Sequence, residues 1–210
     1  DNVVQNSEMG IDIQEDDFSS AKLYSVNSRR VTGEYENKTG KHKYVTYDCN
    51  ETTITLKGYS FYFDVIMRCY DDGYAFRYGI RKIDGSEGVM TVLEEKTQFA
   101  LPEKTRLWAM EYAPNGDYNA FSYERSYLRY SSQDLVPTQS LTMPLLYKAG
   151  GTDTYSLIAQ SELVGSGYYG TFLHATEEGS GVLQTEHNRA GAVLYDDQVA
   201  YPFESPWRLG

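Results

Sequence analysis

The sequence predicts an all-β fold made of antiparallel strands, and three observations support this. From Tyr44 onward, short segments rich in β-branched and aromatic residues recur at about 8–12-residue spacing, with turn residues between them. No window of about a dozen residues shows the 3.6-residue periodicity of an amphipathic helix. Tyrosine supplies 20 of the 210 residues, and its ring packs well on a half-buried pleated surface. Strands without intervening helices favour an antiparallel sandwich or barrel over an α/β fold.

The first 20 residues are polar and acidic, with one alternating piece at 9–13 that indicates a strand followed by a loop. The other expected strands cover residues 44–48, 53–56, 60–70, 75–80, 88–93, 141–147, 155–161, 170–174, 182–185 and 192–195. Asp71-Asp72-Gly73 indicates a tight turn, because Asp tolerates and Gly favours positive φ. We expect a loop over 107–134, with one or two helical turns within 123–130. No repeat or Pro/Ser-rich linker divides the chain, so we expect one domain over 1–210.

The charge excludes some classes of partner. Thirty acidic residues face 19 basic ones, which gives a formal net charge of −11. Such a protein lacks the cationic surface that nucleic acids and anionic membranes require, so neither is an expected partner. No apolar run approaches the roughly 18 residues of a membrane-spanning helix.

The two cysteines, Cys49 and Cys69, flank a predicted hairpin that turns near residues 58–60. Phe61, Phe63, Val65 and Met67 alternate along the second strand, on the face that also carries Cys69. Ile54 and Leu56 are the apolar positions of the first strand, which places Cys49 on the opposite face. Pairing apolar with apolar positions would therefore point the two sulfur atoms to opposite sides of the sheet. A β-bulge between them would permit a disulfide.

Few residues form a pattern that indicates chemistry. His42, His174 and His187 have no metal-ligand spacing, and no nucleophile–base set or phosphate-binding glycine loop is present. Most acidic clusters lie at turns and indicate a solvated surface. Glu162 differs, because it follows a predicted strand and precedes Gly165-Ser-Gly167. A carboxylate at such a strand end suits a hard cation such as Ca²⁺, although one glutamate is not a metal site.

Aromatic residues are concentrated between residues 108 and 130. They are Trp108, Tyr112, Tyr118, Phe121, Tyr123, Tyr127 and Tyr130. Two interpretations stay open: the rings pack a long excursion back onto the sandwich, or some of them form a platform for a sugar or a partner.

Four ordered motifs resemble the N-terminal domain of family 97 glycoside hydrolases. The first is the turn and strand Asp71-Asp72-Gly73-Tyr74-Ala75-Phe76-Arg77-Tyr78, and the last is Ser205-Pro206-Trp207-Arg208. Between them, Tyr123-Glu124 with Tyr127 resembles a Tyr-Glu-x-x-Tyr element. Ser161-Glu162 with Tyr168, Gly170, Phe172 and Leu173 is similar to a further motif of the family. The motifs span about residues 50–208. The first 45 residues match poorly, and we expect the earliest strands of the family's domain to be absent or shortened.

The resemblance implies an antiparallel β-super-sandwich like that of galactose-mutarotase-like domains. In the family this domain precedes a (β/α)₈ barrel, which carries the catalytic carboxylates that hydrolyse α-glucosidic or α-galactosidic bonds in oligosaccharide substrates. The domain supplies part of the active-site wall and, in calcium-dependent members, one glutamate ligand, which by motif match is Glu162. Tyr123 and Glu124 are the candidate substrate-binding residues. We expect calcium in the full-length enzyme and not in the isolated domain. Location would be periplasmic or extracellular.

The resemblance leaves alternatives open. The chain alone lacks a catalytic carboxylate pair, so we expect the barrel to act in cis and this chain to be inactive alone. We also expect an exposed apolar surface where a barrel would dock. The alternative is a free-standing carbohydrate-binding module that uses the aromatic residues of 108–130. Mutarotase activity has weaker support, because fold does not carry function and no His/Glu pair can be placed.

Overall fold

The computed structural model describes residues 6–39, 41–112, 125–163, 168, 170–186 and 198–210. In these ranges the chain forms short and long strands, whose bounds are β1 Ile11–Ile13, β2 Lys22–Glu36, β3 Tyr44–Lys57, β4 Phe61–Cys69, β5 Tyr74–Lys82, β6 Gly88–Glu95, β7 Gln98–Ala100, β8 Arg106–Ala109, β9 Glu111–Tyr112, β10 Leu128–Ser131, β11 Ser140–Leu141, β12 Leu145–Lys148, β13 Tyr155–Ser161, β14 Phe172–Ala175, β15 Val182–Glu186, β16 Gln198–Tyr201, β17 Phe203–Glu204 and β18 Trp207–Leu209. The helices of the described residues are two 3₁₀ turns, η1 (Phe18–Ser20) and η3 (Ser132–Asp134). None of the described helices is long and apolar enough to span a membrane.

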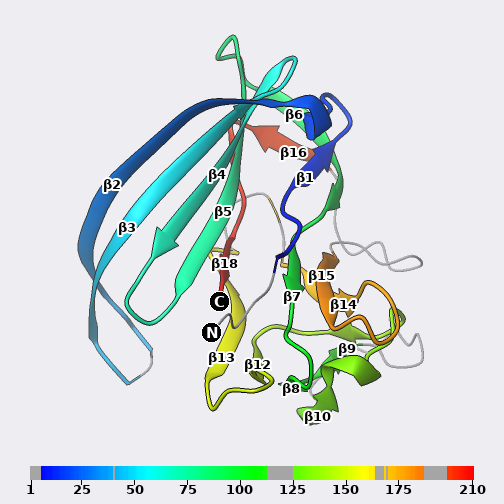
Figure 1. Cartoon of the computed structure of the whole chain (residues 1–210). Coiled ribbons are helices and arrows are strands. Elements are labelled where there is room, and N and C mark those ends of the chain that lie inside the picture. Colours follow the sequence, from blue (N-terminus) through cyan, green and yellow to red (C-terminus); the bar gives the residue numbers. More distant parts are fainter. Residues whose placement is uncertain (1–5, 40, 113–124, 164–167, 169, 187–197) are drawn as a thin grey trace.

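The strands form three antiparallel sheets. The largest has the order β10-β8-β12-β13-β18-β5-β4-β3-β2, with β17 also paired to β5. A five-stranded sheet, β7-β15-β14-β11-β9, and a three-stranded sheet, β1-β6-β16, complete the set. Figure 1 shows β2–β5 as a curved sheet, with the smaller sheets on its inner side. The all-β antiparallel sandwich predicted from the sequence is confirmed.

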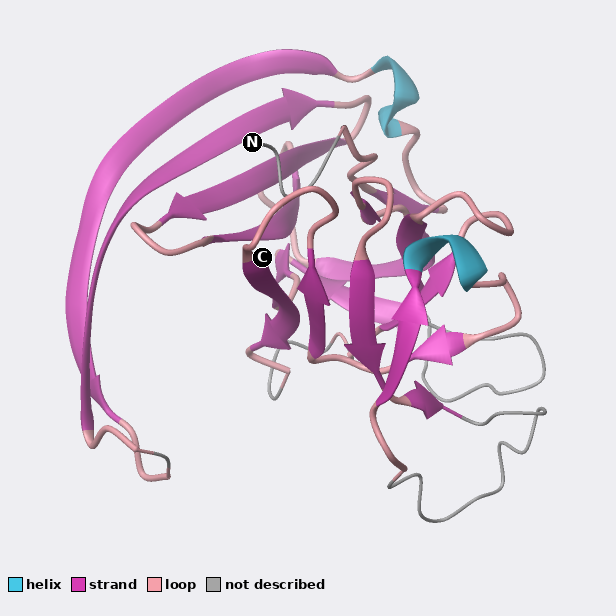
Figure 2. Cartoon of the chain, turned by 60° about the horizontal axis from the view of Figure 1, so that its bottom comes forward, coloured by secondary structure: helices cyan, strands magenta, loops and turns pink. Residues whose placement is uncertain are grey.

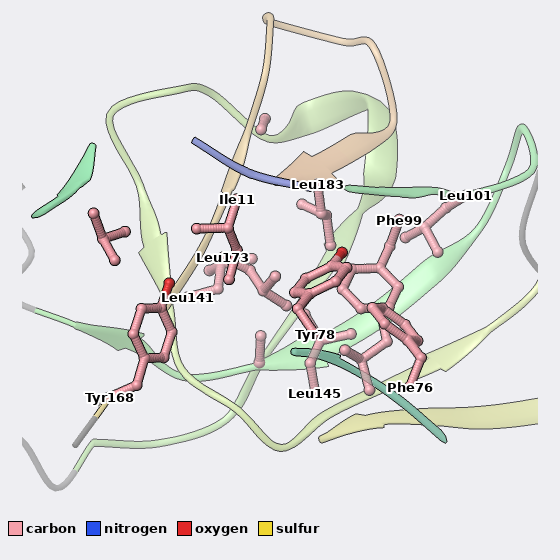
Figure 3. Packing of buried hydrophobic residues seen from close by; sticks show 14 of the residues in the cluster. Ile11, Phe76, Tyr78, Phe99, Leu101, Leu141, Leu145, Tyr168, Leu173 and Leu183 are labelled. Carbon is pink, nitrogen blue, oxygen red and sulfur yellow. The ribbon is translucent and has the colours of Figure 1, made fainter. Parts of the chain in front are cut away.

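The core forms where alternating apolar residues of the large sheet meet the smaller sheets. On β5, Phe76, Tyr78 and Ile80 are buried, whereas the alternate residues face the other side of the sheet. Tyr78 stacks on Phe63 of β4 with ring centres 5.4 Å apart, and Phe76 packs against Phe99 of β7. Figure 3 shows Phe76, Tyr78 and Phe99 close together in this cluster. The core therefore fixes which face of β5 is left for other roles.

The expectation that the earliest strands are absent or shortened is wrong. β2 is fifteen residues long, and it pairs with β3 in a regular antiparallel register from Lys22↔Lys57 to Glu36↔Tyr44, with one irregularity between Leu23 and Ser25. Figures 1 and 2 show this pair as a long curved hairpin that extends beyond the rest of the sheet. Most of the side chains of β2 are exposed, on both faces of the strand. β2 is therefore held by its backbone hydrogen bonds to β3, and not by burial of its side chains. For this reason its sequence lacks the alternating hydrophobic pattern from which a strand can be predicted.

The expected loop over 107–134 is wrong where β8, β9 and β10 form, whereas residues 125–127 contain no strand or helix, as expected. β8 pairs with β10 through Trp108↔Arg129 and Leu107↔Tyr130, and Leu107 is fully buried. Residues 128–130, which lie in the segment where one or two helical turns were expected, are therefore part of a strand. The pairing partner lies some twenty residues away along the chain, and the local sequence does not show it.

At two places the structure divides the chain into strands differently from the prediction. The segments predicted over 44–48 and 53–56 are one continuous strand, β3, because β2 and β4 pair along both of its edges. The strand predicted over 141–147 is split into β11 and β12 by Met143-Pro144. Proline has no amide hydrogen, which interrupts a ladder of backbone hydrogen bonds. The strand predicted over 192–195 lies outside the described residues.

The cysteine geometry follows the prediction. β3 and β4 pair without a bulge, with Ile54 opposite Val65, and Cys69 lies opposite Asn50, the residue next to Cys49. Adjacent residues on a strand point to opposite faces. Both cysteines are free thiols, Cys49 buried and Cys69 exposed.

Candidate functional site

Glu162 lies directly after β13, where the strand ends. Its backbone has φ +61°, in the left-handed region that non-glycine residues rarely adopt. Its side chain is 62% exposed. The structure therefore places Glu162 directly after a strand, as the sequence predicts, and its carboxylate is exposed to solvent.

Arg77, in the middle of β5, holds Glu162 and a second carboxylate. Its Nη1 lies 3.2 Å from Oε2 of Glu162, and its Nη2 lies 2.8 Å from Oε2 of Glu204. The arginine side chain is only 18% exposed. One guanidinium thus joins two segments that are about forty residues apart in sequence.

Strand register explains why these residues meet. β13 pairs with β18 so that Ser161 lies opposite Trp207. β18 also pairs with β5, with Arg208 opposite Phe76. Trp207 is therefore brought beside Arg77, on the face of β5 opposite the core. β17 places Glu204 opposite Gly79 of the same strand.

Trp207 contacts two arginines. The guanidinium carbons of Arg77 and Arg68 each lie 4.5 Å from the centre of its ring, a distance at which cation–π attraction is favourable. Arg68 is bound in turn by Glu51, with Nε 2.8 Å from Oε2, and Arg29 lies 2.6 Å from the other oxygen of Glu51. We call Glu51, Arg68, Arg77, Glu162, Glu204 and Trp207 the arginine–tryptophan cluster. It crosses one face of the large sheet from β3 to the end of β13.

Glu51 is the most buried carboxylate of this cluster. Burial alone would raise its pKa, but hydrogen bonds from Arg68 and Arg29 outweigh this and leave the pKa below its ordinary value. Glu51 therefore stays ionised at neutral pH.

Two hollows flank Glu162. One, of about 560 Å³, is lined by Asp64, Arg77 and Glu204 among others. The other, of about 600 Å³, is lined by tyrosines of the β2–β3 hairpin, including Tyr35 and Tyr47, and by Trp207. A carboxylate between a charged and an aromatic hollow can contact a polar ligand in either one.

A buried network fixes the strand that carries Trp207. The next residue, Arg208, donates from Nη2 to Oε2 of Glu95 at 2.7 Å. Tyr168 donates its hydroxyl hydrogen to the same oxygen at 2.8 Å, and Thr97 donates to Oε1. Burial raises the pKa of Glu95, yet attraction to Arg208 and these hydrogen bonds bring it below its ordinary value. Burial and the Glu95 charge raise the pKa of Tyr168.

Of the residues described at this site, Glu162 is the one that suits calcium as a ligand. Glu162 supplies an exposed carboxylate, the oxygen donor that Ca²⁺ prefers. In the described ranges, no three or more His, Cys, Asp or Glu side chains come together to hold a metal. Ca²⁺ takes six to eight oxygen ligands, so Glu162 fits a shared site to which the described part of the chain contributes one ligand.

The other predicted site residues are Tyr123, Glu124 and the aromatic residues of 108–130, and the structure describes only some of them. Tyr123 and Glu124 lie outside the described residues, as do Tyr118, Phe121 and His187. The aromatic rings of 108–130 that are described pack in separate places. Trp108 lies against Tyr155, and Tyr112 stacks on Phe172 of the five-stranded sheet with ring centres 4.5 Å apart.

Reasoning from the sequence missed what Arg77, Glu204 and Trp207 do together. Two of them stand within the motifs quoted above, but the motifs do not show that they touch Glu162. The available signal was the alternation of Arg77 with the apolar residues of its strand, which places Arg77 on the face opposite the core.

Solved structures of larger enzymes share the fold of this chain. The chain matches a glycoside hydrolase family 97 enzyme from Pseudoalteromonas sp. strain K8, solved in complex with panose, with a TM-score of 0.76 and 22% identity over 99% of this chain and 30% of that one. It matches a β-arabinopyranosidase with a TM-score of 0.81 and 25% identity, over 99% of this chain and 34% of that one. The chain is thus similar to the β-sandwich part of larger glycoside hydrolases.

The sequence matches the Glycosyl-hydrolase 97 N-terminal family over residues 1–209, and the chain belongs to this family. The match includes the first 45 residues, in which the motifs of the family are hard to recognise. A curated relative, described as a probable retaining alpha-galactosidase from Streptomyces bingchenggensis (strain BCW-1), is 31% identical over 98% of this chain. The chain spans 29% of that relative's length.

Proposed function

We propose that this chain is the N-terminal domain of a longer glycoside hydrolase that acts on α-glucosidic or α-galactosidic bonds. In this proposal the domain forms part of the active-site wall, and Glu162 gives one ligand to a calcium ion whose other ligands come from a catalytic barrel in cis. The position of Glu162 carries the proposal: it is an exposed carboxylate at a strand end, held by Arg77 between two hollows. A periplasmic or extracellular location is part of the same proposal.

The surface of the large sheet supports a docking role. Leu146 and Leu157 lie opposite each other on β12 and β13, and Trp108 lies opposite Leu146 on β8. Both leucines are exposed. This apolar row lies on the same sheet face as Ser161 and Trp207, because Leu157 and Ser161 are four residues apart on one strand. An apolar row beside the candidate site is typical of a surface that a second domain covers.

The proposal is tested by comparing this chain with the whole natural protein on nitrophenyl α-glucoside and α-galactoside. We expect turnover by the whole protein and none by the 210-residue chain, because glycoside hydrolysis needs two carboxylates that flank the scissile bond. Turnover by the chain alone would contradict the proposal. Saturable binding of maltose or melibiose by the chain alone would favour the carbohydrate-binding module instead.

A further inference from the structure

We propose that Arg77 is a positioning residue for Glu162. Its guanidinium sets the direction of the Glu162 carboxylate, while Glu204 and Trp207 hold the guanidinium in place. This inference rests on the proposed function, in which Glu162 is a calcium ligand.

Glu162 has little else in the described structure to orient it. Its side chain is 62% exposed, and its contact with Arg77 uses one carboxylate oxygen, Oε2. An exposed glutamate samples many rotamers, and ordering it to bind a cation costs conformational entropy. A neighbour that restricts the carboxylate beforehand reduces this cost. Because the carboxylate has two oxygens, it can keep Arg77 on one while it offers the other to a cation.

Arg77 is suited to this task because it is fixed on several sides. Glu204 binds Nη2 at 2.8 Å, closer than the 3.2 Å contact to Glu162. The guanidinium carbon lies 4.5 Å from the ring centre of Trp207, a residue that is only 5% exposed. The residue after Trp207, Arg208, is anchored in the core by Glu95. The fixed part of the site is therefore the arginine, and the adjustable part is Glu162.

The contacts also require the shape of arginine. A planar guanidinium presents donors in a rigid fork, so it can bind two carboxylates in fixed directions while its face packs on an aromatic ring. A lysine ammonium keeps the positive charge but has no fork and no plane. Arg77→Lys therefore removes the orientation and preserves the charge beside Glu162.

The test is calcium affinity measured by isothermal titration calorimetry on the whole natural protein, with Glu162→Gln, Arg77→Lys and Arg30→Lys compared with wild type. Partners that orient a metal ligand typically contribute 10–100-fold to affinity. We expect Arg77→Lys to weaken calcium binding by about 10-fold or more. Arg30, on β2, also binds a carboxylate with two nitrogens, that of Asp48, and Arg30→Lys should leave calcium affinity within about twofold of wild type, since neither residue belongs to the cluster.

The outcomes separate the two proposals. Wild-type affinity in Arg77→Lys, together with weakened binding in Glu162→Gln, would overturn the positioning role alone. Wild-type affinity in Glu162→Gln would overturn the proposed ligand and the positioning role with it. If Arg77→Lys does not fold, Glu204→Gln is the alternative variant. It keeps Arg77 but weakens the contact that holds the Arg77 guanidinium in place. It should then weaken calcium binding without lowering the melting temperature of the calcium-free protein by more than Asp48→Asn does, and unchanged affinity in Glu204→Gln would count against the inference.

Discussion

Arg208 and Glu95 form an ion pair that solvent does not reach. Arg208 Nη2 lies 2.7 Å from Glu95 Oε2, and Nε lies 3.1 Å from Oε1; each side chain is 1% exposed. The pair joins β18 of the large sheet to the end of β6 in the three-stranded sheet. Because Arg208 follows Trp207, the pair connects the core of the sandwich to the arginine–tryptophan cluster.

Replacing one partner of this pair should strongly destabilise the fold. Glu95→Gln leaves the buried guanidinium of Arg208 without a counter-charge, and such losses typically cost 3–5 kcal/mol. We expect a decrease of about that size in the free energy of unfolding, measured by urea denaturation. The control is Asp48→Asn, because Asp48 pairs with Arg30 at an exposed position and its loss should be nearly neutral. Equal effects of the two variants would show that Glu95 is not buried with Arg208.

The same pair predicts a loss of stability in acid. The pKa of Glu95 lies below its ordinary value near 4.5, so the carboxylate contributes stability above the unfolded pKa. That contribution is lost as pH falls through the lower, folded pKa. We expect the free energy of unfolding to decrease below pH 4.5, and to decrease less steeply in Glu95→Gln. Parallel curves for wild type and variant between pH 6 and pH 3 would exclude Glu95 as a source of this dependence.

The two thiols should differ in reactivity. Cys69 is exposed and Cys49 buried, and a thiol reagent reaches only accessible sulfur. With an Ellman-type reagent we expect one thiol to react in the native protein and two after denaturation. Cys69→Ser should abolish the native reaction. No free thiol after denaturation would instead reveal a disulfide.

Truncation of a buried leucine should destabilise the fold much more than truncation of an exposed one. Leu173 on β14 has no exposed surface, whereas Leu23 on β2 is 64% exposed. Leu173→Ala should lower the free energy of unfolding by about 2–5 kcal/mol through lost burial and a cavity. Leu23→Ala should change it by less than about 0.5 kcal/mol. Chemical denaturation of both variants measures this, and a similar cost at both positions would contradict the assignment of the sandwich core.

The sequence shows the strands that bury one face. Phe76, Tyr78 and Ile80 alternate with Ala75 and Arg77 on β5, and this pattern alone predicts the strand. It does not show β2, which is exposed on both faces and formed by its register with β3. Strand β10 is hidden for a related reason, because its partner β8 is distant in the chain.

The candidate site could be predicted only in part. The motif match indicates Glu162, and the structure gives that residue an exposed place at a strand end. Its contacts with Arg77 and Glu204 depend on the order β13-β18-β5 in the large sheet. Glu95 and Arg208 are 113 residues apart. Neighbours of this kind become visible only when the fold brings the strands together.

The most direct test of the proposed role of Glu162 is a crystal structure of the whole natural protein grown with calcium, with the ion located by its anomalous scattering. We predict a calcium ion with a carboxylate oxygen of Glu162 at about 2.3–2.6 Å, and with its other protein ligands from outside this chain. A calcium ion in the catalytic site that Glu162 does not contact would contradict the account.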